Sequence, residues 1–151
     1  MGCIVQELEH QLNIIIRKAA IDDADDLFAL VQVFAASFVP ESESFCLCLE
    51  ELVDRDDVLL NVAVIDDEIA GYCLGFDHYT FYANGRVSWV EEIMVRSDLR
   101  LKGVGRALMT AFEAWAFDRG SKLVGLATRR AAPFYTALGY EDSAVFFKKL
   151  I

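Results

Sequence analysis

Three runs of strand-forming residues, separated by two turn signals, constrain the fold of this chain more than any other feature. Residues 58–65 are apolar and rich in β-branched side chains, and residues 68–79 and 86–95 form two further runs. Asp66-Asp67 separates the first two runs, and Asn84-Gly85, the strongest short hairpin signal in the chain, precedes the third. The middle of the chain therefore predicts three antiparallel strands joined by hairpins, a β-meander over residues 58–95.

Helices are predicted both before and after these three strands in the sequence. Acidic residues crowd the start of the first helix, where the helix dipole favours them. The predicted helices are residues 22–38, 42–53, 103–118 and 131–138, with further strands at 14–18, 122–127 and, as one or two closing strands, 140–150. The resulting order, β-α-α-β-β-β-α-β-α-β, predicts an α/β fold (a mixed α+β sheet) with helices on its faces, in a single domain spanning 1–151.

Composition narrows the class of protein. The net charge of −10 argues against nucleic acid as a partner, and it fits an amine substrate or simple solubility equally well. No apolar run reaches the roughly 18–20 residues that span a bilayer, and the N-terminus has no secretory pattern, so we expect no membrane partner and a cytoplasmic protein. Cys46 and Cys48 could suggest a metal pair, but reduced cysteines are the better interpretation, and no metal is expected.

A glycine-containing turn lies between the third strand of the meander and the following helix, in the pattern Arg100-x-x-Gly103-x-Gly105. Helix N-termini present unpaired amide groups to anions, and glycines let phosphate oxygens approach the backbone. Arg100, Lys102 and Arg106 add positive charge at this point of an acidic chain. The turn lacks the Gly-Lys-Ser/Thr ending of a Walker loop and the third glycine of a dinucleotide fingerprint. By itself it fits either a flexible entry to the helix or an anion site of another kind.

Two motifs together resemble the GNAT superfamily of N-acetyltransferases. Residues 95–108, which contain this turn, resemble its hallmark motif, and residues 133–140 resemble its second motif, Y-x-x-x-G-[F/Y]. The resemblance implies acetyl-CoA as cosubstrate and a splayed central sheet. Its pantetheine would lie along the backbone of Ile93, Met94 and Val95, with a bulge near residues 92–94 freeing an amide for the thioester oxygen. The other implied CoA contacts are Arg100, Leu101, Lys102, Gly103, Val104, Gly105, Arg106, Thr128 and Phe134. Thr128 replaces an Asn that is frequent in the family, which leaves that contact open. Arg129 and Arg130 beside it could reach CoA phosphates or a substrate carboxylate, or could simply be solvated residues at the start of a helix.

The resemblance also implies candidate catalytic residues. Tyr135 matches the family's general acid, although a tyrosine packed in the CoA cleft could instead donate only a hydrogen bond. Glu91 and Glu92 are the candidate bases: Glu91 is favoured because strand alternation gives it the face of Val95, and structural pairing with Arg86 or Arg96 is the alternative for both. Weaker candidates for the acceptor side are Phe38, Val39, His78 and the aromatic residues Tyr79, Phe81, Tyr82 and Trp89, most of which could equally pack on the sheet.

The expected activity is acetyl transfer to the primary amine of a small molecule, by direct attack in a ternary complex. A polyamine, an aminoglycoside and an amino-acid derivative all fit the sequence. A protein N-terminus or lysine as acceptor, and a non-catalytic acyl-CoA-binding or sensing module, are the alternatives. A homodimer is a further expectation, to which the apolar segment 144–147 could contribute.

Overall fold

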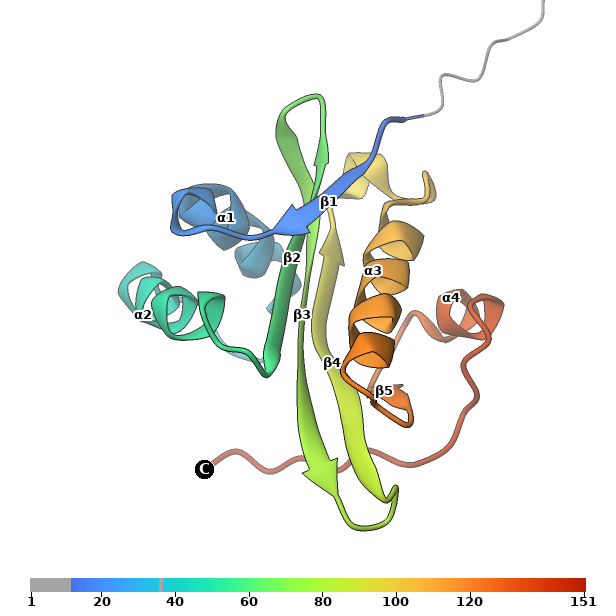
Figure 1. Cartoon of the computed structure of the whole chain (residues 1–151). Coiled ribbons are helices and arrows are strands. Elements are labelled where there is room, and N and C mark those ends of the chain that lie inside the picture. Colours follow the sequence, from blue (N-terminus) through green and yellow to red (C-terminus); the bar gives the residue numbers. More distant parts are fainter. Residues whose placement is uncertain (1–11, 36) are drawn as a thin grey trace, which may run out of the picture.

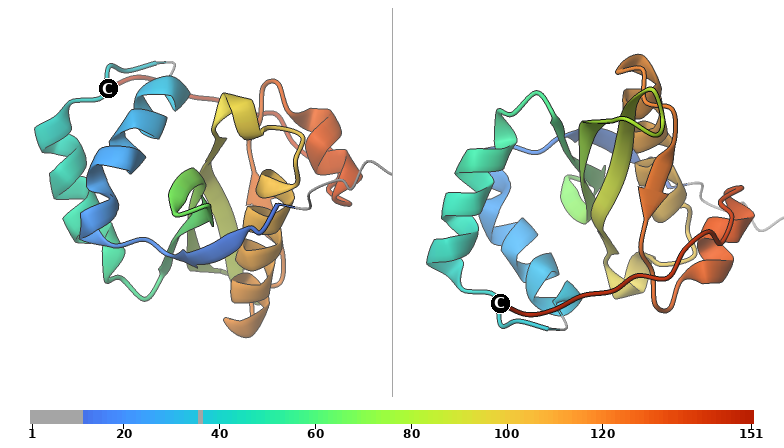
Figure 2. Two further views of the ribbon diagram at one scale, coloured as in Figure 1. Left: turned by 90° about the horizontal axis from the view of Figure 1, so that it is seen from above. Right: turned by 90° about the horizontal axis from the view of Figure 1, so that it is seen from below.

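A computed structural model describes residues 12–35 and 37–151. Its centre is a five-stranded sheet in the order β1-β2-β3-β4-β5, in which β1 to β4 are antiparallel neighbours and β5 runs parallel to β4. The helices α1 and α2 cover one face, and α3 and α4 the other (Figures 1 and 2). The elements are β1 (Ile15–Lys18), the 3-10 helix η1 (Ile21–Asp23), α1 (Ala24–Phe34), α2 (Ser42–Val53), β2 (Val58–Ile65), β3 (Glu68–Thr80), β4 (Gly85–Val95), the 3-10 helix η2 (Ser97–Leu99), α3 (Val104–Asp118), β5 (Val124–Leu126) and α4 (Ala132–Ala137). The predicted mixed sheet is confirmed.

Both predicted hairpins of the meander are confirmed. Asp66 and Asp67 have φ angles of 50° and 63°, which is the left-handed pair that a two-residue turn between twisted strands requires. Asn84 also has a positive φ, of 54°, and ends the turn between β3 and β4. These turns depend only on neighbouring residues, so the sequence signals were sufficient to find them.

Two apolar clusters sandwich the sheet. The cluster on the α1–α2 face includes Leu27, Leu49, Leu60, Val62, Tyr72 and Met94. The cluster on the α3–α4 face includes Cys73, Val90, Leu108, Met109, Phe112 and Tyr135. Alternation along β3 and β4 separates the two sets. α3 packs closely because β3 has a glycine beneath it: a Cβ on Gly75 would collide with the ring of Phe112.

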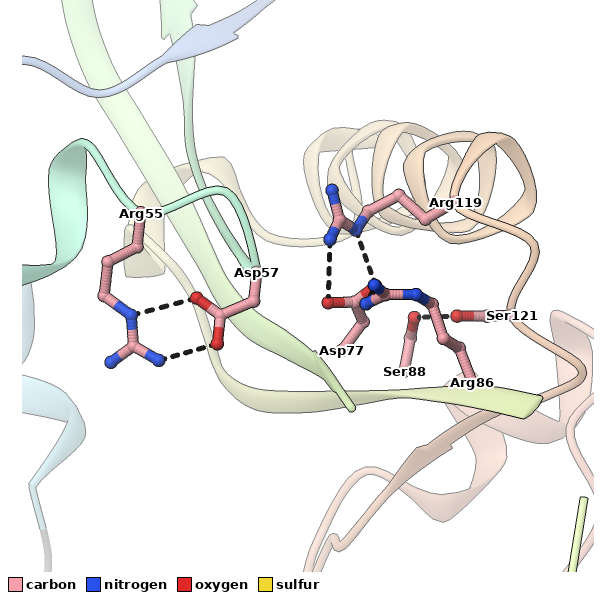
Figure 3. A network of polar contacts seen from close by, with 7 residues as sticks. All are labelled: Arg55, Asp57, Asp77, Arg86, Ser88, Arg119 and Ser121. Carbon is pink, nitrogen blue, oxygen red and sulfur yellow. Dashed lines mark hydrogen bonds and ion pairs between the residues drawn. The ribbon is translucent and has the colours of Figure 1, made fainter. Parts of the chain in front are cut away.

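A buried carboxylate fastens the end of α3 to the sheet (Figure 3). Asp77 of β3 has a fully buried side chain and accepts hydrogen bonds from Arg86 of β4, at 2.8 Å, and from Arg119, which follows α3. Ser88 and Ser121 join the same two regions through hydroxyls 2.7 Å apart. Two arginines balance the charge of Asp77, which is the condition under which a buried carboxylate is tolerated.

Two sequence expectations are wrong. The first helix was expected to extend to residue 38, but it ends at Phe34, and the backbone of Ala35 is extended. Phe38 and Val39 are 71% and 88% exposed, so burial of their side chains would not stabilise a further helical turn. The closing strands expected over 140–150 do not form in the described structure, where this segment runs irregularly past the sheet (Figure 2, right). Its apolar residues have a strand-like composition, but a strand also needs a neighbouring backbone edge.

Candidate active site

β4 and β5 pair along only part of β4. The paired residues run from Ser88 with Val124 to Val90 with Leu126. β5 ends there, whereas β4 continues to Val95. Within the described part of the chain, the edge of residues 91–95 that faces away from β3 therefore has no strand beside it. This is the opening in the sheet that the splayed arrangement was expected to provide.

A β-bulge lies at the start of this open edge. Leu74 of β3 pairs with Glu92, whereas Gly75 pairs with Val90, so Glu91 is the extra residue on β4. The bulge was expected near residues 92–94, and it lies just before them. It shifts the alternation of β4, so the side-chain directions of residues before and after it no longer follow from simple counting.

The backbone beyond the bulge offers hydrogen-bonding groups to the open edge. The N–H of Arg96 donates to the carbonyl of Ala70 at 2.8 Å. Because an antiparallel ladder alternates, the N–H and C=O groups of Val95 and Ile93 then point away from β3. Met94 between them faces β3 with its backbone and buries its side chain in the α1–α2 cluster. The open edge therefore presents the main chain of Ile93 and Val95, as expected, and not that of Met94.

The predicted anion turn lies at the end of this edge. Leu101 has a φ of 62°, and Gly103, with a φ of 89°, is the N-cap of α3, a conformation that glycine adopts without strain. Arg100 Nε donates to the carbonyl of Val95 at 3.3 Å, which ties the turn to β4. The side chains of Arg100, Lys102 and Arg106 are exposed around the first turn of α3. The amides that open the helix and three cations thus meet beside the open edge.

Phe134 and Thr128 belong to the segment that follows β5, and Phe134 contacts the first turn of α3. A Cβ placed on Gly105 would be 3.2 Å from Phe134 Cζ, so the glycine lets the aromatic ring approach the first turn of α3. Thr128 Oγ1 accepts a hydrogen bond from the N–H of Ala131 at 3.1 Å, and so stabilises the turn that leads into α4. Arg129 beside it is exposed.

Tyr135 is buried on α4, 8% exposed, on the α3–α4 face of the sheet. Its ring stacks edge-on against Phe134, with centroids 5.0 Å apart, and against Tyr140 at 5.9 Å. Burial disfavours the phenolate and raises the pKa of Tyr135 to about 12. The hydroxyl therefore keeps its proton at neutral pH and can act as a donor.

A cavity of about 540 Å³ lies on the opposite face of the sheet, between α1, α2 and the strands. Most of its lining is aliphatic or aromatic, and Glu92 is the acid that β4 contributes. The lining residues are Leu27, Val31, Val39, Pro40, Glu41, Ser44, Phe45, Cys48, Leu49, Leu52, Leu60, Tyr72, Leu74 and Glu92. Its size and composition are those of a small-molecule site.

The two adjacent glutamates of β4 have different surroundings. Glu92 lines the cavity and accepts a hydrogen bond of 2.6 Å from the hydroxyl of Tyr72. Glu91, the bulge residue, is exposed and does not line the cavity. The arginines considered as structural partners are engaged elsewhere: Arg86 pairs with Asp77, and Arg96 pairs with Asp98 and Glu68.

Among the weaker acceptor-side candidates, Phe38 and Trp89 are not part of the cavity lining, and the others divide into two groups. Val39 lines the cavity, at the junction of the first two helices. His78, Tyr79, Phe81 and Tyr82 lie at the far end of β3 and its turn, away from the cavity lining, and the three aromatic residues are largely exposed. The guanidinium of Arg86 lies over the ring of Tyr79, 4.2 Å from its centroid. These aromatic residues therefore neither line the cavity nor pack in the core of the sheet.

Tyr72 is the residue that sequence reasoning missed. It is 2% exposed, and its hydroxyl is a buried polar group whose partner is Glu92. The signal was available in part, since a tyrosine in a buried strand needs a hydrogen-bond partner. Nothing local in the sequence says which acid that partner is.

The described structure thus combines an opened mixed sheet, a cationic glycine turn at one end of the opening and an acid-lined cavity on one face. The chain belongs to the acetyltransferase (GNAT) family, whose sequence model matches residues 24–140. It is an N-acetyltransferase, and the family uses acetyl-CoA as cosubstrate.

Relatives of known structure or activity cover nearly the whole chain. A D-amino-acid N-acetyltransferase of Saccharomyces cerevisiae is 29% identical over 95% of this chain and 96% of its own. Glucosamine-6-phosphate N-acetyltransferase from Arabidopsis thaliana has the same fold, with a TM-score of 0.78 at 24% identity over 91% of this chain and 97% of its own. AAC(6')-Iy, solved with a CoA-containing bisubstrate analogue, has a TM-score of 0.76 at 19% identity over 91% and 99%. No helix in residues 12–35 and 37–151 is long and apolar enough to cross a membrane.

Proposed function

We propose that this chain transfers the acetyl group of acetyl-CoA to the primary amine of a small molecule, by direct attack in a ternary complex. One observation carries the proposal: the open edge of β4 lies between a cationic glycine turn and a cavity lined by Glu92. A donor held along that edge and an acceptor held in the cavity would meet at the sheet opening. Holding both reactants in one geometry supplies much of the rate enhancement in such transfers.

The residues present fit the donor. The main-chain groups of Ile93 and the N–H of Val95 face the open edge, where they can pair with the amides of a pantetheine arm in the manner of an added strand. The carbonyl of Val95 accepts a hydrogen bond from Arg100 Nε. The amides that open α3 and the side chains of Arg100, Lys102 and Arg106 suit a pyrophosphate. Phe134 flanks this turn. Thr128 has its hydroxyl engaged in the turn before α4, so it is the least suited of the expected contacts.

The reaction exchanges one bond for another. The neutral amine nitrogen attacks the thioester carbonyl carbon and the C–N bond forms. The nitrogen then releases its second proton to solvent, and the C–S bond breaks to leave an amide and a thiolate, which takes up a proton to become the thiol. The attacking ammonium must first lose a proton, and Glu92 faces the cavity from which the amine comes. We therefore assign Glu92, rather than Glu91, as the group that binds the ammonium and takes its proton, directly or through water.

Tyr135 suits the departing sulfur. It lies on the face of the sheet opposite the acceptor cavity. A thiol has an ordinary pKa of about 8.5. A phenol whose pKa is about 12 holds its proton more firmly than that thiol does, so hydrogen-bond donation to the thiolate is favoured over outright proton transfer. The proton that completes the thiol then comes from solvent.

The test is an acceptor screen with the purified full chain. Release of free thiol is followed in the presence of acetyl-CoA and a panel of primary amines, and binding of acetyl-CoA is measured separately by calorimetry. Thiol release that depends on one class of amine is the expected result. Tight acetyl-CoA binding without turnover of any small amine would instead favour a sensing module, and turnover of peptides alone would favour a protein acetyltransferase.

The C-terminal segment supports the expected homodimer. Val145, Phe146 and Phe147 are 64–87% exposed in the chain by itself, and their composition is that of a strand. β5, at the edge of the sheet, has three residues and a free outer edge among the described strands. A second copy of the chain could bury both this apolar segment and the outer edge of β5. Light scattering coupled to gel filtration tests this, and a monomeric chain at micromolar concentration would contradict it.

A further inference from the structure

We propose that the acceptor is a primary amine with an apolar substituent and without a carboxylate, held in the cavity between α1, α2 and the sheet. An alkylamine or an arylalkylamine has this chemistry. The inference rests on the proposed function, because it names the substrate class of that same site.

The walls of the cavity are the first argument. Nine of its lining residues have side chains without a polar atom: Leu27, Val31, Val39, Pro40, Phe45, Leu49, Leu52, Leu60 and Leu74. Such a surface stabilises an apolar substituent by removing it from water, and it offers few partners to hydroxyls. An acceptor with many hydroxyl groups would leave most of them without hydrogen bonds.

The charge of the cavity is the second argument. Among the described residues, its lining includes two carboxylates, Glu92 and Glu41, and no lysine, arginine or histidine. Glu41 and Glu43 also place negative charge at the N-terminus of α2, where a substrate carboxylate could otherwise have found amide donors. An amino-acid acceptor would therefore bring its carboxylate among carboxylates, with no cation of the lining to pair it.

The position of Glu92 is the third argument. The hydroxyl of Tyr72, itself buried, holds one oxygen of the Glu92 carboxylate at 2.6 Å, which fixes the carboxylate in the cavity wall. One ammonium group can pair with it. A second ammonium on the same acceptor, as in a diamine, would lie against the leucine and valine side chains of the wall unless it reached Glu41 at the rim.

Matched pairs of acceptors test the substrate class. Phenethylamine and phenylalanine differ only by a carboxylate, and pentylamine and 1,5-diaminopentane differ only by a second amine. We expect kcat/KM to be at least about 30-fold higher for phenethylamine than for either enantiomer of phenylalanine, and about tenfold higher for pentylamine than for the diamine. Equal or reversed values in the first pair would overturn the inference while leaving the acetyltransferase activity established.

Two cysteines on α2 allow acceptor binding to be measured without acetyl transfer, through their rates of alkylation. Both cysteines are exposed, but only Cys48 lines the cavity. With CoA bound, phenethylamine should slow alkylation of Cys48 by iodoacetamide several-fold and leave Cys46 unchanged, as measured by peptide mass spectrometry; phenylalanine should protect neither. Protection without acetylation would support the cavity assignment and refute catalysis, and an unprotected Cys48 beside efficient acetylation would refute the cavity assignment.

A pair of charge variants tests the same point from the protein side. Cys48→Arg places a guanidinium in the cavity, and Cys46→Arg adds the same charge to the same helix outside it. We expect the phenylalanine-to-phenethylamine ratio of kcat/KM to rise about tenfold in Cys48→Arg and to stay at the parent value in Cys46→Arg. The same ratio in both variants would show that charge in the cavity does not set acceptor choice.

Discussion

The hydroxyl of Tyr72 on β3 donates a 2.6 Å hydrogen bond to Oε2 of Glu92 on β4, across the cavity-facing side of the sheet. Tyr72 pairs with Met94 and Leu74 pairs with Glu92, so the two residues are diagonal neighbours on one face of an antiparallel pair. Burial and the neighbouring Glu92 carboxylate raise the pKa of Tyr72 and keep the phenol protonated. The bond makes Glu92 a positioned acid whose carboxylate cannot easily turn away from the cavity.

Replacing Glu92 by Gln should lower kcat/KM for the amine acceptor by about 100-fold, because the variant can neither pair with the ammonium nor accept its proton. Steady-state thiol release measures this. The adjacent Glu91→Gln should lose less than about threefold, since Glu91 is exposed and outside the cavity lining. A larger loss in Glu91→Gln than in Glu92→Gln would reverse the assignment.

The variant Tyr135→Phe should lower kcat by about 10–100-fold and leave the KM for acetyl-CoA nearly unchanged, because only the donor to the departing sulfur is removed. The pKa of Tyr135, raised to about 12 by burial, places its ionisation above the working range. The kcat profiles of the parent and the variant should therefore have the same shape between about pH 6 and pH 10. An unchanged rate, or an alkaline limb present only in the parent, would contradict this role.

The substitution Gly103→Ala should weaken acetyl-CoA binding about tenfold, because a residue with a side chain resists the φ of 89° that orients the amides opening α3. Gly120 provides the control at the other end of the same helix: its φ is 75°, and a Cβ added there would meet no atom of the described residues within 4 Å. Both variants should lose about 1–2 kcal/mol of stability. Calorimetry should find weaker acetyl-CoA binding only in Gly103→Ala. Equal acetyl-CoA affinities in the two variants would contradict a role of the turn in binding the cosubstrate.

Breaking the buried ion pairs of Asp77 should destabilise the fold without a direct effect on the site. Asp77→Asn leaves Arg86 and Arg119 without their carboxylate and should lower the free energy of unfolding by about 2–4 kcal/mol. Asp57→Asn breaks a partly exposed pair with Arg55, also drawn in Figure 3, and should cost less than about 1 kcal/mol. Urea denaturation separates the two, and equal losses would contradict the role of burial.

The sequence by itself determined those features that depend on neighbouring residues. The turns at Asp66-Asp67 and Asn84-Gly85 determined the meander, and the turn from Arg100 to Gly105 determined the glycine-capped start of α3, because backbone conformation at a turn depends on a few adjacent side chains. The two motifs together were also enough to predict the family that the comparison confirmed.

Only the tertiary structure decided which glutamate faces the cavity between α1, α2 and the sheet. Counting along β4 by twos gave Glu91 the face of Val95, but the cavity lies on the opposite face, which Glu92 shares with Met94. The bulge makes Glu91 the extra, exposed residue, and Glu92 accepts the hydrogen bond of Tyr72. A bulge is a property of two strands, and a cavity is a property of every element around it, so neither is present in any local stretch of sequence. The closing segment 140–151 shows the same limit, because strand-forming residues make a strand only where another backbone edge accepts them.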